Sequence, residues 1–203
     1  MTHVEAVWDR MEFRTPWARQ RELDRVEAAI GRFLLWHHRN ERQVVGIEQD
    51  FRAVLDLPDG EKVRLTGYAD RLEIDADGRL VVVDLKTNRA KPTDKSLPEN
   101  VQLGLYQLAV DHGAVAEVAG DAVAGGAELV HLGLRDGPPD AVVQAQAVQA
   151  EDSPERDLLR AKLSHAVGLL RREEFPAVVG PQCRDCPFEP ICPARSAGHV
   201  AAR

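Results

Sequence analysis

Three side chains near the middle of the chain have the types and spacing needed for metal-assisted chemistry. Asp70 lies in one apolar run, and Asp84 and Lys86 close the next one, residues 80–86. Because side chains alternate faces along a strand, Asp84 and Lys86 are expected to lie on the same face. Two buried carboxylates near one another are costly unless a cation sits between them. Hard divalent ions such as Mg²⁺ bind such carboxylates, and waters fill the remaining positions.

The two runs that carry these residues predict a β-hairpin. Residues 62–74 and 80–86 are rich in β-branched residues, and they flank a turn that contains Asp77 and Gly78. An Asp-Gly pair between two apolar runs is a strong hairpin signal. The hairpin would bring Asp70 towards the end of the second strand. The alternative is an ordinary hairpin with surface charges.

A polar pair on the following helix is expected to face the same place. The sequence predicts a helix over residues 99–111, opened by Pro98, with Glu99 in its first turn. Gln102 and Tyr106 are four residues apart and therefore share one helix face. If this helix packs across the end of the sheet, the pair faces the carboxylates. The alternative is a polar flank of the helix.

The rest of the chain supplies the elements that must position these side chains. Apolar periodicity predicts helices and strands around the hairpin. The expected helices cover residues 17–42 and 154–173, and the further strands cover residues 44–57, 128–134 and 141–148. Residues 112–126 predict a weak helix or a flexible connection. His37 and His38 are interpreted as polar residues at a helix end, and His131 as a packed or exposed strand residue, rather than as metal ligands.

Length and composition indicate one globular domain. The chain has 203 residues, of which 44% are hydrophobic and 29% charged. The formal net charge of −7 argues against broad, non-specific nucleic-acid binding. A local basic patch remains, because Arg89 and Lys91 follow the strand that ends in Lys86. This patch is predicted to meet phosphates near the site, and the alternative is a solvated loop.

No segment predicts membrane insertion or secretion. No apolar run approaches the roughly 18 residues of a membrane span. The first residues lack the basic and apolar regions of a signal peptide. A cytoplasmic location is therefore expected.

The three cysteines form one cluster near the end of the chain. Cys183, Cys186 and Cys192 are separated by two and five residues. An odd, clustered set in a chain without secretion signals predicts a metal or iron–sulfur site rather than a disulfide framework.

Taken together, these motifs resemble the PD-(D/E)XK nuclease superfamily, most closely its RecB-like/AddB-like exonuclease branch. The resemblance covers about residues 44–110 and the three cysteines. It implies an α/β, restriction-endonuclease-like fold with a central mixed β-sheet flanked by helices. Residues 1–175 would form the nuclease domain, and residues 176–203 a cysteine-containing tail that packs on it.

The resemblance also implies the roles of the hairpin residues. Asp70, Asp84 and the backbone carbonyl of Leu85 would hold Mg²⁺ or Mn²⁺. Lys86 would orient or activate the attacking water and stabilise charge on the phosphate.

The same resemblance assigns the helix pair and the partners. Gln102 and Tyr106 match the branch's Gln-x-x-x-Tyr motif, which helps to position the substrate or the catalytic lysine. The reaction would be hydrolysis of DNA phosphodiesters by an exonuclease in DNA repair or recombination. The chain has no phosphate-binding ATPase loop of its own, so a helicase subunit or domain is the expected partner.

The chain departs from the branch in two ways. In relatives, three C-terminal cysteines and a fourth from far upstream hold a [4Fe–4S] cluster. Here the fourth cysteine is missing, as is an upstream helix with a metal-binding histidine. A C-terminal piece of a longer protein, or a shortened relative, would explain both. His199 would be an alternative fourth ligand in a Cys₃His zinc site.

Two other functions fit the sequence. The chain would be a catalytically incomplete DNA-binding or scaffolding module that keeps the nuclease fold, which the missing histidine and cysteine favour. Alternatively, the cysteines belong to a small zinc-binding interaction domain attached to an unrelated α/β enzyme.

Overall fold

The structure is a computed structural model that describes residues 6–8, 10–58, 60–135 and 137–194. The chain divides into two compact units, Met1–Arg160 and Ala161–Arg203, and each is described by itself. The division of the chain into a domain of residues 1–175 and a tail that packs on it stays a prediction.

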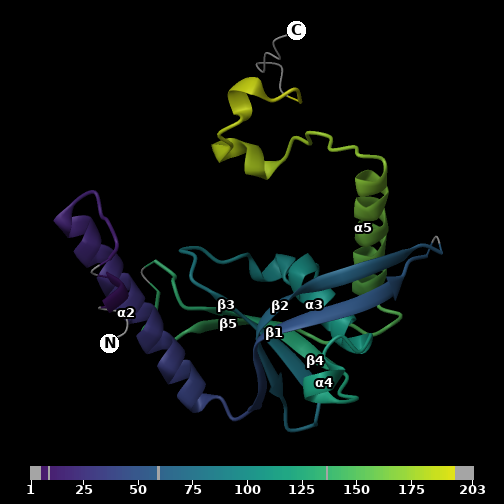
Figure 1. Ribbon diagram of the computed structural model, residues 1–203, viewed down its shortest axis with the longest axis horizontal. Coiled ribbons are helices and arrows are strands. Elements are labelled where there is room, and N and C mark those ends of the chain that lie inside the picture. The colour runs from purple at the N-terminus through teal and green to yellow at the C-terminus, as the bar shows by residue number, and fades with distance from the viewer. Residues whose placement is uncertain (1–5, 9, 59, 136, 195–203) are drawn as a thin grey trace. The chain divides into compact units, whose positions relative to one another are not determined.

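The first unit is built on one five-stranded mixed sheet (Figure 1). Its strands are β1 (Gln43–Asp56), β2 (Lys62–Ile74), β3 (Leu80–Lys86), β4 (Ala124–His131) and β5 (Val142–Gln146), in spatial order β1-β2-β3-β4-β5. Strands β3 and β4 run parallel, and the other neighbouring pairs run antiparallel. The predicted α/β fold with a central mixed sheet is therefore confirmed.

Helices cover both faces of this sheet. The helices are α2 (Pro16–Arg39), α3 (Val101–Asp111), the short α4 (Ala116–Ala119) and α5 (Pro154–Arg171), of which the first turns belong to this unit. On one face, α2 packs Phe33 and Trp36 on a core that includes Val81 and Val83. Helix α3 lies on the opposite face, since its side chains contact Asp84, the next residue along β3.

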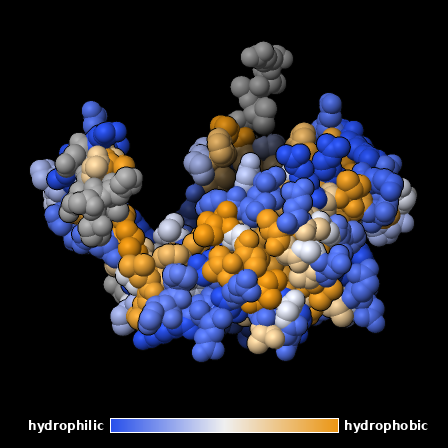
Figure 2. Space-filling model, turned by 60° about the horizontal axis from the view of Figure 1, so that its bottom comes forward, coloured by the Kyte–Doolittle hydropathy of each residue, from blue (hydrophilic) through white to orange (hydrophobic). Residues whose placement is uncertain are grey.

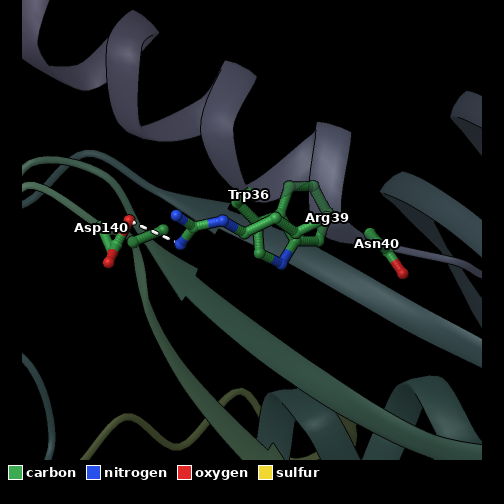
Figure 3. Close-up of a pocket in the computed structure, with 5 residues that line it drawn as sticks. Trp36, Arg39, Asn40 and Asp140 are labelled. Carbon is green, nitrogen blue, oxygen red and sulfur yellow. Dashed lines mark hydrogen bonds and ion pairs between the residues drawn. The ribbon is translucent and has the colours of Figure 1, made fainter.

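The end of α2 is fixed to the connection between β4 and β5. Arg39 Nη1 lies 2.9 Å from Asp140 Oδ1, beside a hollow of about 180 Å³ lined by Trp36 and Asn40 (Figure 3). About two turns earlier, Arg32 donates a hydrogen bond to the Leu132 carbonyl at 2.7 Å. These contacts hold the C-terminal half of α2 against the sheet.

A buried carboxylate ties the same helix end to β2. Glu73 has no exposed side-chain surface, and both of its oxygens accept hydrogen bonds from Asn40 Nδ2, at 2.7 and 2.8 Å. Its other partners are Arg71 Nε at 2.5 Å and Arg42 Nε at 3.0 Å. Arg42 also forms a bidentate ion pair with Glu128 of β4. The network therefore joins α2, β2 and β4.

The hairpin between β2 and β3 has the predicted turn. The Asp75 N–H donates to the Arg79 carbonyl at 2.9 Å, and the Gly78 N–H donates to the Asp75 carbonyl at 3.0 Å. Gly78 has a φ of 76°, a left-handed conformation that glycine adopts without steric cost. The Asp75 carboxylate accepts the N–H groups of Arg79 and Asp77, and the bond from Arg79 is the main cause that lowers the Asp75 pKa. The turn thus sets the register that places Asp84.

Several element boundaries differ from the predictions, and two of them bear on the site. Helix α3 begins at Val101, because Asn100 accepts the Leu103 N–H and caps the helix, so the predicted opening at Pro98 is wrong. Strand β4 begins at Ala124 rather than at residue 128. Parallel pairing with β3 recruits the Ala/Gly segment, whose local sequence alone predicts no strand.

The second unit contains the rest of α5 and the cysteine segment. Two short 3₁₀ turns, η2 (Pro181–Asp185) and η3 (Glu189–Ile191), follow the helix. Each turn is followed directly by a cysteine, Cys186 or Cys192. Within the described ranges of both units, no helix has the length and apolar character needed to cross a membrane.

Candidate active site

The candidate site is centred on Asp84, near the end of β3. The residue is 4% exposed. Its Oδ1 accepts a hydrogen bond from Gln102 Nε2 at 2.9 Å and lies 3.3 Å from the Tyr106 hydroxyl. Its Oδ2 lies 2.5 Å from Lys86 Nζ as an ion pair, and accepts no hydrogen bond of normal geometry from the residues that the structure describes. A buried carboxylate is thus held between an amide, a phenol and an ammonium group.

Asp70 enters the site where β2 and β3 separate. The last paired residues of the two strands are Arg71 and Val83. Just beyond this pair, Asp70 Oδ2 accepts the backbone N–H of Leu85 at 2.7 Å. This bond fixes the Asp70 carboxylate beside the residue that separates Asp84 from Lys86. The hairpin therefore brings the two carboxylates to one end of the sheet, as the sequence predicts.

Helix α3 places its polar pair over the end of β3. Gln102 Nε2 lies 3.1 Å from the Tyr106 hydroxyl, as the four-residue spacing predicts. Lys86 Nζ donates to Gln102 Oε1 at 3.1 Å, while Gln102 Nε2 donates to Asp84. One amide therefore bridges the acid and the lysine and fixes their relative positions.

The Tyr106 hydroxyl stays protonated over the whole neutral range. The side chain is mostly buried, and this desolvation is the largest cause that raises the pKa of Tyr106 to about 12. The negative charges of Asp84 and Asp70 raise the pKa further. The hydroxyl also lies 3.3 Å from the Tyr68 carbonyl. It therefore has one proton to donate, either to Asp84 or to this carbonyl.

The two basic residues predicted to bind DNA lie on the segment after β3. Arg89 lies 3.6 Å from Glu22 of α2, beside a hollow of about 880 Å³ between α2 and the ends of β3 and β4. The space-filling view shows apolar side chains along the hollow next to α2 (Figure 2). Lys91 Nζ donates to Asp94 Oδ1 at 3.0 Å. Their roles in DNA binding stay predictions.

The cysteines of the second unit are partly buried and not joined by disulfides. The Gly180 N–H lies 3.4 Å from Cys183 Sγ. In the part of the chain that the structure describes, no group of three or more His, Cys, Asp and Glu side chains is arranged to hold a metal ion. His199, the alternative fourth ligand, lies outside the described residues. An iron–sulfur or zinc site at Cys183, Cys186 and Cys192 stays a prediction.

Two buried residues lie next to the site: Gln144, which sequence analysis did not single out, and His131, for which the packed alternative is correct. His131, interpreted only as a strand histidine, is 1% exposed and lies opposite Lys86 in the register of β3 and β4. Its Nε2 lies 2.9 Å from Oε1 of Gln144 on β5. The available signal was the two-residue spacing of Gln144 and Gln146, which puts both glutamines on one face of the strand, and this face is buried.

Comparison with known families agrees with this geometry. The family model of the PD-(D/E)XK nuclease superfamily matches residues 1–193, so the chain belongs to this superfamily. Membership implies nuclease activity with DNA as the substrate, and these nucleases typically use divalent metal ions.

The structure is also similar to a solved structure described as "Crystal structure of SSO0001", at 17% sequence identity and a TM-score of 0.47. That similarity covers 89% of this chain and 72% of the other. The comparison with curated proteins finds no match.

Proposed function

We propose that the chain is a metal-dependent DNA exonuclease of the RecB-like type. The observation that carries the proposal is the meeting of Asp70, Asp84, Lys86, Gln102 and Tyr106 at one end of the sheet. These residues come from two strands and a helix, and hydrogen bonds link Asp84, Lys86, Gln102 and Tyr106, while the Leu85 N–H holds Asp70 beside them. Residues 1–175 would be the nuclease domain, in the cytoplasm.

The donors at this site suit a hard divalent ion. Asp84 Oδ2 is buried with the Lys86 ammonium group as its described ion-pair partner, and Asp70 lies nearby, held by the Leu85 N–H. Two carboxylates and the Leu85 carbonyl would hold Mg²⁺ or Mn²⁺, with waters completing the coordination. When bound, the metal lowers the pKa of a coordinated water and neutralises charge on the phosphate.

The protein's own groups would position the reactants. Lys86, held by its hydrogen bond to Gln102, presents its ammonium group to the attacking water or to a phosphate oxygen. Gln102 prevents Lys86 and Asp84 from moving independently. Tyr106, which keeps its proton, offers its hydroxyl as a hydrogen-bond donor to Asp84.

The RecB-like assignment rests on the order of the motifs along the chain. The Asp-x-Lys strand is followed by Gln102 and Tyr106 on the next α-helix, and by the three cysteines near the end. This order supports a role in DNA repair or recombination beside a helicase. Pull-down with a candidate helicase, and stimulation of cleavage by that helicase, would test the partnership.

The cysteine segment is proposed as a [4Fe–4S] site completed by a ligand from elsewhere. Thiolates are stabilised by N–H donors, and the Gly180 N–H lies near Cys183 Sγ. Two similar 3₁₀ turns also present Cys186 and Cys192 in the same way. Iron, sulfide and zinc measured per chain after anaerobic purification would test this. Stoichiometric zinc without iron would contradict it and favour a zinc-binding domain.

One observation favours the second candidate, a catalytically incomplete DNA-binding module. Lys86 Nζ lies 2.5 Å from Asp84 Oδ2, so the ammonium group occupies the carboxylate oxygen that a metal ion would need. A nuclease must exchange this ion pair for the metal. A binding module would keep it, and its affinity for DNA would not depend on divalent ions.

Cleavage of linear and closed circular DNA tests the proposed reaction. An exonuclease degrades an end-labelled linear strand in the presence of Mg²⁺ or Mn²⁺ and leaves a covalently closed circle intact. Cutting of the circle would contradict the exonuclease assignment. DNA binding without any cutting, in the presence of either metal, would contradict the nuclease and support the binding module.

A further inference from the structure

Strand β5 carries a buried glutamine that joins the site to the loop after β3. Gln144 is 4% exposed. Its Nε2 lies 3.1 Å from the Pro92 carbonyl and 2.5 Å from Asp94 Oδ1, while its Oε1 lies 2.9 Å from His131 Nε2. One amide therefore connects β4, β5 and the segment 87–100.

The contacts of Gln144 allow only one orientation of its amide. Both hydrogens on Nε2 point to oxygen acceptors, so Oε1 must receive a proton from His131 Nε2. A reversed amide would place its oxygen against the Pro92 carbonyl and the Asp94 carboxylate. His131 is buried and lies opposite Lys86 in the parallel register. The amide is thus oriented from the side of the active site.

Asp94 connects Gln144 to Lys91 by hydrogen bonds. Asp94 Oδ1 accepts hydrogen bonds from Gln144 Nε2 and from Lys91 Nζ, the latter at 3.0 Å. The bond from Gln144 and then that from Lys91 lower the pKa of Asp94, so the carboxylate stays ionised at neutral pH. The path from Gln144 to the Lys91 ammonium group therefore consists of two hydrogen bonds to one carboxylate oxygen.

The Lys91 ammonium group lies near the same imidazole as Lys86. Burial is the main cause that lowers the pKa of His131, and the charges of Lys91 and Lys86 lower it further, while the hydrogen bond with Gln144 and the charge of Asp84 raise it. Both ammonium groups therefore lie within electrostatic range of one buried side chain. Because His131 lies opposite Lys86, hydrogen bonds through Gln144 and Asp94 connect the neighbour of the catalytic lysine to a second cation, Lys91.

The segment that carries Lys91 depends on such contacts for its shape. Between Lys86 and Val101, the only regular element is the 3₁₀ turn η1 (Asp94–Ser96). Ordering each residue of an irregular segment costs about 1–2 kcal/mol of backbone entropy. Hydrogen bonds from a rigid strand to the Pro92 carbonyl and Asp94 offset part of this cost. The position of Lys91 is then determined by β5 rather than by the loop itself.

We propose that Gln144 is a positioning residue that holds Lys91 beside Lys86 as a second cation for a phosphate of the DNA strand. The proposal rests on the proposed nuclease function and deepens it. Lys91 would contact a phosphate next to the one that is cut, and Gln144, through Asp94, would keep the ammonium group in place while the strand is bound.

The same strand offers a matched control. Gln146 is also 4% exposed, and its Nε2 lies 2.8 Å from the Leu97 carbonyl and 3.1 Å from the Pro98 carbonyl. It therefore supports the segment before α3 rather than Lys91. Truncating Gln146 removes an equally buried amide from the same strand without touching Asp94.

The test is the salt dependence of DNA binding in a double-mutant cycle. Fluorescence anisotropy of a labelled single-stranded oligonucleotide, in EDTA so that no strand is cut, gives affinity against salt concentration. Lys91→Ala is expected to make the slope of log K against log [salt] shallower by about 0.7, which is about fivefold in affinity at 0.1 M salt. Gln144→Ala should give the same change, and Gln146→Ala none.

The double variant decides the proposal. If Gln144 acts through Lys91, then Gln144→Ala changes neither the slope nor the affinity in the Lys91→Ala background. Independent, additive effects of the two substitutions would overturn the proposal. So would a Gln144→Ala variant that folds and binds with the original salt slope.

A second variant keeps the proposal testable if Gln144→Ala does not fold. Asp94 is exposed, so Asp94→Ala leaves the core intact while it breaks the link to Lys91. It should reproduce the slope of Lys91→Ala, and an unchanged slope would contradict the proposal. A cleavage assay on the same samples separates the two claims. If the effects of Gln144→Ala and Lys91→Ala on the salt slope are coupled but no variant cleaves DNA, the nuclease proposal alone is contradicted. If DNA is cleaved but the two effects are additive, the positioning role alone is contradicted.

Discussion

Removing the charge of Glu73 should be among the most destabilising single changes in this fold. Glu73→Gln keeps the shape of the side chain but replaces one acceptor oxygen with an NH₂ group. That group would face Asn40 Nδ2 or the Arg71 guanidinium, both of which donate to Glu73. Arg71, whose side chain is 6% exposed, would lose its carboxylate partner, and its other described partners, His37 Nδ1 at 3.0 Å and the ring of Trp36, carry no negative charge.

The expected loss follows from an unpaired buried charge. Breaking a buried ion pair on one side costs about 3–5 kcal/mol. The free energy of unfolding of a natural domain is about 5–15 kcal/mol. For a chain of this size, each kcal/mol lowers Tm by about 2–4 °C, so Glu73→Gln should lower Tm by about 6–20 °C.

Glu128→Gln is the matched control for this prediction. Glu128 pairs with Arg42, as Glu73 does, but its side chain is 15% exposed, so solvent compensates part of its loss. Urea denaturation followed by circular dichroism gives both free energies of unfolding. Glu73→Gln should cost clearly more than Glu128→Gln. An equal cost, or a cost below about 1 kcal/mol for Glu73→Gln, would refute the view that this network is a buried, coupled one.

Three further predictions concern the site and its surroundings. Gln102→Ala removes the bridge between Asp84 and Lys86 and should lower the initial rate of DNA cleavage by about 10–100-fold, because each hydrogen bond to a charged group contributes about 1.5–3 kcal/mol. A rate within twofold of the parent would contradict this role. In thermal unfolding, Gly133→Ala should cost more than 1 kcal/mol, because its Cβ would lie 1.9 Å from the Thr87 carbonyl oxygen, whereas Gly31→Ala has open space and should stabilise by about 0.5–1 kcal/mol. The free energy of unfolding, measured in urea, should fall as the pH drops below 6.5, because burial lowers the pKa of His131 and the unfolded chain then binds a proton that the folded chain does not. His131→Gln should make this pH dependence weaker. A pH dependence that is the same in His131→Gln as in the parent would contradict the role of His131.

The arrangement around Asp84 could be predicted because it rests on short-range geometry. The two-residue spacing of Asp84 and Lys86 fixes a shared strand face, and the four-residue spacing of Gln102 and Tyr106 fixes a shared helix face. The turn at Gly78 then sets the register of the hairpin. Each of these relations needs only the backbone periodicity of one element or one tight turn.

The features that sequence analysis missed depend on contacts between distant segments. The start of β4 at Ala124 is determined by parallel pairing with β3. The partner of Ala124 in β3 is Leu80, which lies 44 positions earlier in the chain. The burial of Glu73 and of Gln144 depends on which helix or loop covers each face of the sheet. Polar residues at such positions look like surface residues in a sequence, because periodicity does not reveal the partners that satisfy them.

The central claim is that Asp84 and Lys86 carry a metal-dependent cleavage of DNA. Degradation of a linear DNA should be compared in Mg²⁺ or Mn²⁺ for the parent chain, Asp84→Ala, Lys86→Ala and the control Asp56→Ala, which removes an exposed carboxylate of β1 that pairs only with exposed Lys62 among the described residues. The account predicts cleavage by the parent and by Asp56→Ala, and none by the two site variants while both remain folded. Cleavage that survives Asp84→Ala or Lys86→Ala would contradict it, as would a folded parent that cuts no DNA in either metal.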